Sequence, residues 1–228
     1  MPSGRRILVS WSGGKDAAWA LHQLGSPGNG EVVGLVTSVV PELGRSAMHG
    51  VRLDLIRMQA RSAALPLLEV ALPWPCPNER YEAAFLAGLA QAREAWGVTH
   101  VAFGDLFLED IRVYRERLLS GSGLEPLFPL WHRPTAELLD AMLAAGVRAT
   151  IVCLDPAQLD RRFAGRELDQ ALAAELPAGV DRCGERGEFH TFVSAGPMLA
   201  SPVPVEAGEV VERDGFVYAD LRSAATYG

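Results

Sequence analysis

Apolar positions in the first two thirds of the chain follow two alternating patterns. Short, nearly continuous apolar runs are typical of buried strands, and stretches in which apolar residues recur every three or four positions are typical of amphipathic helices. We expect strands at 7–10, 32–40, 67–72, 98–103, 127–130 and 147–154, and helices at 17–24, 51–64, 78–96, 111–119 and 138–143. This alternation predicts an α/β fold, a parallel sheet with helices on both faces.

The expected sheet also predicts where ligands bind. In parallel sheets, ligand sites lie beyond the carboxyl ends of the strands. Four segments should therefore share one rim: residues 10–16, 37–49, 104–110 and the loop after Leu154. In the helix at 78–96, Asn78 is the expected N-cap and Gly97 the expected stop.

The last third of the chain has a different pattern. A helix expected at 166–176 is followed by Pro177 and Gly179, which break it, and the chain becomes strand-like after the glycine-rich segment 184–188. An Asp-Gly pair between 210–213 and 216–221 predicts a hairpin. We therefore expect an N-terminal α/β domain over 1–130 and a smaller C-terminal α+β region over 131–228.

Composition and charge exclude several classes of protein. A hydrophobic content of 49% with 21% charged residues is typical of a globular chain. The cysteines (Cys76, Cys153 and Cys183) are odd in number and have no Cys-x-x-Cys spacing, which argues against a disulfide scaffold and favours a cytoplasmic location. No apolar run is long enough to span a bilayer, so we expect no membrane partner. A net charge of −7 argues against nucleic-acid binding.

A glycine-rich loop joins the first expected strand to the first expected helix. It reads Ser10-Trp11-Ser12-Gly13-Gly14-Lys15-Asp16. Successive backbone N–H groups in front of a helix N-terminus form an anion site. Serine hydroxyls and Lys15 add donors and positive charge, and Asp16 is a candidate magnesium ligand. The loop is not a Walker A motif, because Val9 and Asp16 stand where that motif needs glycine and a hydroxyl residue.

The basic residues single out the same loop. They comprise 20 arginines and one lysine, Lys15. An ammonium is a compact point charge on a thin stem, whereas a guanidinium is a wide planar fork. A narrow phosphate site that admits only the thinner side chain explains why this position keeps lysine.

These motifs together resemble a known family. Ser12-Gly13-Gly14-Lys15-Asp16 resembles the PP-loop of ATP pyrophosphatases. The segments Met48–Val51, Gly104–Arg112, Pro129–Trp131 and Cys183–Thr191 are similar to the diphthine–ammonia ligase family, and most similar to its bacterial-type ATP-binding branch. The resemblance covers about residues 5 to 200. The chain departs from the family pattern at Ala17, Arg186 and His190.

The resemblance implies an adenine nucleotide alpha hydrolase-like (HUP/PP-loop) fold, with a substrate-binding or lid region at the C-terminus. It also implies an ATP-dependent ligase that adenylates a carboxylate, releases pyrophosphate, and then lets ammonia displace AMP. The partners would be ATP, Mg²⁺, ammonia and a small or protein-borne carboxylate, and a homodimer is one candidate assembly. The candidate ATP-binding residues are Ser10, Ser12, Gly13, Gly14, Lys15, Asp16, Thr37, His49 and Gly104.

Further polar residues are candidates for catalysis. Asp105 follows the fourth strand and is a candidate for catalysis and, with Asp16, for magnesium. Glu185 and Glu188 are candidates to position or deprotonate ammonia, and His190 to carry a proton. Lys15 completes the catalytic set. Glu109, Asp110 and Arg112 either contact substrate or occupy a helix N-terminus, where acidic residues favour the dipole.

Two other functions stay open at this point. One is a regulatory module that binds ATP or AMP without turnover, and the other is a PP-loop enzyme acting on a substrate other than diphthine. The dense carboxylates of the late motif favour an enzyme over simple binding. A tRNA-modifying PP-loop enzyme is disfavoured by the negative net charge.

Overall fold

The computed structural model describes residues 4–224 and contains two sheets. The N-terminal sheet comprises β1 (Arg6–Ser10), β2 (Glu31–Val40), β3 (Arg45–Ser46), β4 (Leu67–Ala71), β5 (His100–Ala102) and β6 (Glu125–Leu127). Its order is β3-β2-β1-β5-β6, and β4 also pairs with β2. All pairings are parallel except that of β3 with β2.

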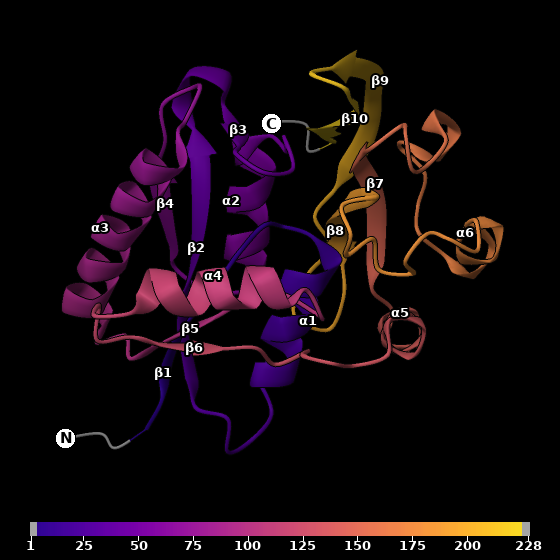
Figure 1. Ribbon diagram of the computed structural model, residues 1–228. Helices are drawn as coiled ribbons and strands as arrows, with labels where there is room; N and C mark the ends of the chain where they lie inside the picture. Colours follow the sequence, from indigo (N-terminus) through magenta and orange to yellow (C-terminus); the bar gives the residue numbers. More distant parts are fainter. Residues whose placement is uncertain (1–3, 225–228) are drawn as a thin grey trace.

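Helices cover both faces of the N-terminal sheet, as Figure 1 shows. These are α1 (Lys15–Leu24), α2 (Leu53–Ser62), α3 (Asn78–Trp96) and α4 (Glu109–Leu119). Alternation along β1 explains the layers. Ile7 and Val9 pack with residues of α1 and α2, whereas Leu8 packs with residues of α3 and α4. The predicted α/β class is confirmed.

The C-terminal sheet is antiparallel and contains β7 (Arg148–Leu154), β8 (Phe189–Ala195), β9 (Val205–Arg213) and β10 (Phe216–Ser223), in the order β8-β7-β10-β9. It is accompanied by α5 (Thr135–Ala144), α6 (Gln170–Glu175) and the 3₁₀ turn η2 (Arg161–Phe163); a further 3₁₀ turn, η1 (Pro41–Leu43), follows β2. The predicted hairpin is confirmed: Asp214 and Gly215 have φ of 53° and 82°, as a tight primed turn requires.

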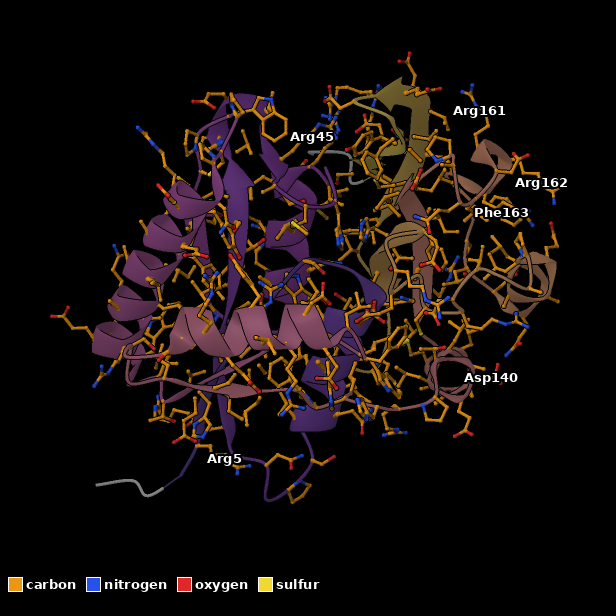
Figure 2. The ribbon with its side chains drawn as sticks, viewed as in Figure 1. Arg5, Arg45, Asp140, Arg161, Arg162 and Phe163 are labelled. Atoms are coloured by element: carbon orange, nitrogen blue, oxygen red, sulfur yellow. The ribbon has the colours of Figure 1, made fainter. Side chains whose placement is uncertain are left out.

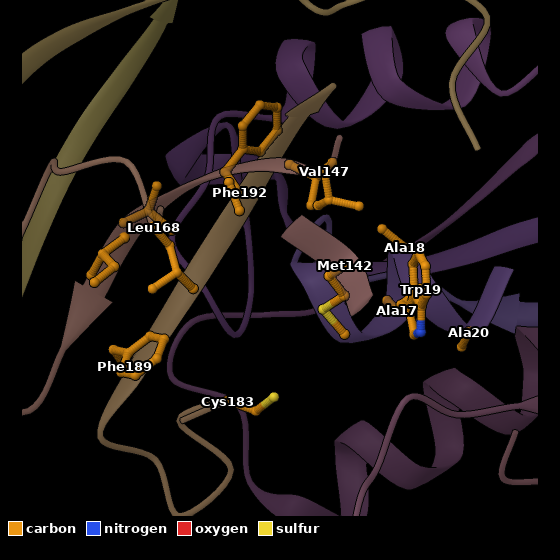
Figure 3. Packing of buried hydrophobic residues seen from close by; sticks show 14 of the residues in the cluster. Ala17, Ala18, Trp19, Ala20, Met142, Val147, Leu168, Cys183, Phe189 and Phe192 are labelled. Atoms are coloured by element: carbon orange, nitrogen blue, oxygen red, sulfur yellow. The ribbon is translucent and has the colours of Figure 1, made fainter. Parts of the chain in front are cut away.

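One hydrophobic core joins the two sheets. Residues of α1 and β1 belong to the same buried cluster as residues of α5, β7 and β8. Figure 3 shows Ala17 and Trp19 of α1 beside Met142 of α5, and Phe192 of β8 beside Val147 in another part of the same cluster. On the outer edge of the C-terminal part, Figure 2 shows Arg161 and Arg162, whereas Arg45 lies near the boundary between the sheets.

Several predicted elements were wrong in detail. Residues 147–154 form a strand, but β7 belongs to the antiparallel sheet, so the loop after Leu154 does not lie on the rim of the parallel sheet. The helix expected at 166–176 shortens to α6, because the backbone N–H of Leu168 pairs with Ala149 and Asp169 caps the helix. The strand expected at 127–130 lies earlier in the chain, because β6 ends at Leu127 and the chain turns over residues 129–132. Pro77 takes the N-cap position predicted for Asn78.

Candidate active site

A cavity of about 620 Å³ lies over the carboxyl ends of the parallel strands and is closed on one side by β8. This size is typical of small-ligand sites. It brings together most of the predicted ATP-binding residues: Ser10, Ser12, Gly14, Lys15, Asp16, Thr37, His49 and Gly104. Of the predicted catalytic residues, Asp105, Glu185 and His190 also line it, with Lys15. Residues 184–191 therefore take the place on the rim that we had expected for the loop after Leu154.

The glycine-rich loop after β1 presents backbone donors to this cavity. α1 begins at Lys15, and Gly14 precedes it with no side-chain cap, so the first N–H groups of the helix have no partner within the helix itself. The Gly14 N–H donates to Ser12 Oγ at 3.2 Å, and the Lys15 N–H donates to Thr191 Oγ1 at 3.1 Å. Gly13 does not line the cavity. Its φ of 81° allows the tight turn by which Ser12 and Gly14 line the cavity.

Lys15 is buried rather than mobile, with 2% of its surface exposed. Its Nζ donates to the two Asp16 oxygens at 3.0 and 2.8 Å and to the Cys183 carbonyl oxygen. Burial lowers the pKa of Lys15, but Asp16 and further negative neighbours raise it more, so the pKa stands above its ordinary value. The ammonium is therefore a permanent positive charge at the wall of the cavity.

Glu185 points back from the C-terminal part toward the N-terminal sheet. One of its oxygens, Oε1, accepts a hydrogen bond of 2.7 Å from the Leu106 N–H. Burial, with smaller contributions from the carboxylates of Asp16 and Asp105, raises the pKa of Glu185 to about 7 against the lowering effects of the Leu106 hydrogen bond and Lys15. A carboxyl group that titrates near neutral pH suits general acid–base chemistry.

Asp105 is paired with an arginine that the sequence did not single out. Arg115 Nε lies 3.4 Å from Asp105 Oδ2, and its guanidinium lies 4.9 Å from the centre of the Phe103 ring. Burial raises the pKa of Asp105, against the lowering effect of Arg115. The residue before Asp105 is Gly104, and a larger residue does not fit there because its Cβ would lie 2.8 Å from the backbone carbon of Asp16.

Two histidines, His49 of the turn after β3 and His190 of β8, lie against each other at the loop. The His49 and His190 rings stack with their centres 4.4 Å apart. Burial lowers the pKa of His190 to about 4, with a smaller contribution from Lys15. Burial, His190 and Lys15 also place the pKa of His49 well below its ordinary value. Both imidazoles are therefore neutral at pH 7.

Glu188 does not take the position predicted for it. It is buried, does not line the cavity, and accepts hydrogen bonds from the backbone N–H groups of Asp181 and Arg186 at 2.8 and 2.9 Å. A carboxylate that satisfies two amides of its own loop holds that loop in shape. We therefore replace the catalytic role predicted for Glu188 with a structural one.

The segment at the start of α4 is also structural on this geometry. Glu109 and Asp110 occupy the first turn of α4, where acidic residues favour the helix dipole. Arg112 bonds Glu116 at 2.8 Å and stacks between Phe128 and Trp131 at 5.0 and 4.9 Å. None of these residues lines the cavity.

Two residues at the loop, Thr191 and Gln59, were assigned no role from the sequence. Thr191 supplies a hydroxyl to the loop, and Gln59 lies behind it with its side chain fully buried. Gln59 occupies the apolar face of α2 together with Leu55, Ile56 and Ala60. A polar residue at a buried helical spacing was the one available clue, because buried amides need partners. No metal-binding group of three or more His, Cys, Asp or Glu occurs within residues 4–224.

This sheet order and glycine-rich loop define a nucleotide-binding α/β protein of the PP-loop class. Two family models match the chain: the diphthamide synthase N-terminal domain over residues 5–126, and the diphthamide synthase C-terminal domain over residues 134–223. The chain therefore belongs to the diphthamide synthase family.

Curated relatives agree with this assignment. Diphthine–ammonia ligases of Bos taurus and Homo sapiens are each 26% identical over 95% of this chain and 88% of their own length. The diphthine–ammonia ligase of Danio rerio is 26% identical over 95% of this chain and 92% of its own length. Within residues 4–224, no helix is long and apolar enough to cross a membrane.

Proposed function

We propose that this protein is an ATP-dependent ligase that forms an amide from a carboxylate and ammonia, with AMP and pyrophosphate as the other products. The observation that carries the proposal is the shared cavity, in which the anion-binding loop faces Glu185 from the C-terminal part. The family membership and the names of the relatives support the same chemistry. The departures at Arg186 and His190 make a carboxylate other than diphthine a second candidate substrate.

In the proposed reaction the substrate carboxylate attacks the α-phosphorus of ATP, and pyrophosphate leaves. The backbone N–H groups of the loop and the Lys15 ammonium would stabilise the negative charge on the phosphates. Ser10, Ser12, Asp16, Thr37, His49 and Gly104 are the other proposed ATP contacts, and Gly13 shapes the loop. Ammonia then attacks the acyl carbon and AMP leaves.

Glu185 is the proposed base for the second step. It lines the same cavity as the loop, and its raised pKa lets it take a proton from the attacking nitrogen near pH 7. His190 is a further proposed catalytic contact in its neutral form, because its pKa of about 4 keeps it unprotonated near pH 7. Asp105 is the proposed substrate contact beside Arg115. Positioning of the reactants would supply much of the rate.

Magnesium, the two regions and the assembly complete the proposal. Asp16 and Asp105 both lie close enough to Glu185 to raise its pKa, and carboxylates grouped in this way suit a divalent cation. Magnesium would neutralise phosphate charge when bound.

We propose residues 1–130 as the ATP-binding domain and residues 131–228 as the substrate or lid region. A cytoplasmic location and a homodimer are further hypotheses, the latter testable by light scattering.

The test is a screen for AMP and pyrophosphate formation with purified protein, ATP and magnesium, with and without ammonium. One arm offers a protein that carries diphthine, and the other offers a panel of small carboxylates. We expect AMP formation with at least one acid and amide formation only with ammonium. Tight ATP binding without AMP formation in either arm would instead indicate a regulatory module.

A further inference from the structure

Gln59 is a buried amide behind the phosphate loop. Its side chain is 0% exposed, and a buried polar group of this kind costs free energy unless it is hydrogen-bonded. Its oxygen accepts a hydrogen bond of 2.9 Å from Trp11 Nε1. Its Nε2 donates to the Gly13 carbonyl at 3.0 Å and to the Val193 carbonyl at 2.6 Å. One side chain therefore connects the loop, α2 and β8.

The bonds to Gly13 fix the orientation of one peptide group. The Gly13 carbonyl accepts from Gln59 and also from the Val193 N–H at 2.9 Å. In a planar trans peptide the C=O and the following N–H point in opposite directions. A Gly13 carbonyl held toward α2 and β8 therefore directs the Gly14 N–H toward the other side, where it donates to Ser12 Oγ at 3.2 Å and where Gly14 and Ser12 line the cavity.

The contact between Gln59 and the loop is close. A Cβ at Gly13 would lie 2.9 Å from Gln59 Oε1 and 2.6 Å from Ile56 Cδ1. A side chain at position 13 would therefore push the loop away from α2, and glycine allows the amide to reach the carbonyl. The two positions are complementary in shape as well as in hydrogen bonding.

We propose that Gln59 is a positioning residue for the phosphates of the nucleotide, because it holds the Gly13–Gly14 peptide with its N–H directed into the cavity. This inference rests on the proposed function, in which the loop binds the phosphates of ATP. Gln59 itself does not line the cavity. Its removal leaves the Gly13 carbonyl held by the Val193 N–H alone, so that the peptide rotates more freely and its N–H is directed less firmly.

The test compares the affinities of ATP and adenosine by isothermal titration calorimetry, for the full chain and the variant Gln59→Met. Methionine has a similar length but no amide. We expect the affinity for ATP to fall about tenfold or more, the size of one lost charge-assisted hydrogen bond. The affinity for adenosine should stay within about twofold, because it lacks phosphates. Leu55→Ala on the same helix is the matched control and should lower thermal stability without changing the ratio of the two affinities.

Gln59→Glu decides the matter if Gln59→Met does not fold. It keeps the acceptor for Trp11 but removes both N–H donors, so the same selective loss of ATP affinity is expected. An unchanged ratio of ATP to adenosine affinity in a folded variant overturns the role of Gln59. Absence of ATP binding in the unmodified protein is a different result, since it contradicts the proposed function itself.

Discussion

At the scale of single residues, Lys15 is the position on which the site depends most. The sequence singled it out as the only lysine, and the structure places its buried ammonium in an ion pair with the partly exposed Asp16. A buried charge whose partner is removed is strongly destabilising. Lys15 therefore contributes to folding as well as to the charge of the site, whereas a role in ligand binding alone would leave stability unchanged.

Replacement of Lys15 by alanine should reduce AMP formation by about 100-fold or more, the typical effect of removing one preorganised electrostatic contact. The melting temperature should fall as well, because Asp16 loses its partner. Lys15→Arg should also lose most activity, since Phe189 and the Cys183 carbonyl leave little room for a guanidinium. Full activity in Lys15→Arg would contradict the narrow site. Steady-state AMP assays and thermal denaturation measure both effects.

Glu185 predicts the pH dependence of the reaction. As a base it works when deprotonated, so turnover should rise as the pH increases through about 7, the raised pKa of Glu185, and level off above it. The profile has to be measured at a constant concentration of free ammonia, because the ammonia supply also rises with pH. In Glu185→Gln the rate should be lower and the step near pH 7 absent. A persistent step in that variant would assign it to another group.

At the scale of elements, the loop after β5 packs directly on the start of α1. A Cβ at Gly104 would lie 2.8 Å from the Asp16 carbon and 2.9 Å from the Ala17 nitrogen, both backbone atoms. Gly104→Ala should therefore shift the phosphate loop, weaken ATP binding and cost about 1–3 kcal/mol of stability. Gly179→Ala is the control, because no heavy atom lies within 4 Å of its added Cβ. Equal ATP affinities in the two variants would refute this packing argument. Calorimetry and denaturant unfolding provide the measurements.

Hydrophobic periodicity was enough to predict most elements of the N-terminal sheet. It failed where contacts with a distant segment decide how a strand pairs or where a helix begins. Residues 147–154 have the same apolar pattern as a parallel strand, and only their pairing with β8 and β10 makes them antiparallel. The backbone of Leu168 pairs with Ala149 and so shortens a helix that the local pattern favours.

The site shows the same limit. Glycines and charged residues marked the loop, Asp105 and Glu185 in the sequence. Spacing alone did not separate Glu185 from Glu188, because the shape of their loop decides which carboxylate faces the cavity and which binds backbone amides. Gln59 and Arg115 were missed because their roles depend on contacts between distant segments.

At the scale of the whole molecule, the two sheets are tied together at the cavity and at a second point. Arg45 and Arg52 bond Asp220 of β10 at 2.9 and 2.6 Å. Burial raises the pKa of Asp220, but the two arginines lower it more, to about 2. Its contribution to stability is therefore complete above the ordinary value of 3.8 and is lost as the pH falls through about 2.

Asp220→Asn should destabilise the protein at pH 7 by about 1–3 kcal/mol, because both arginines lose a charged acceptor. The difference from the unmodified protein should shrink as the pH is lowered toward 2. Glu212→Gln on the exposed strand β9 is the matched control. Urea unfolding at several pH values measures the effect, and identical midpoints for Asp220→Asn and the unmodified protein at pH 7 would show that this ion pair does not stabilise the contact between the sheets.

In the proposed reaction a carboxylate attacks the α-phosphorus of ATP in this cavity. The most direct test uses the acid that the AMP screen identifies, labelled with ¹⁸O in its carboxylate, and mass spectrometry of the nucleotide product. We expect one ¹⁸O atom in AMP, with unlabelled pyrophosphate. Labelled inorganic phosphate together with ADP, or AMP without label, would contradict it.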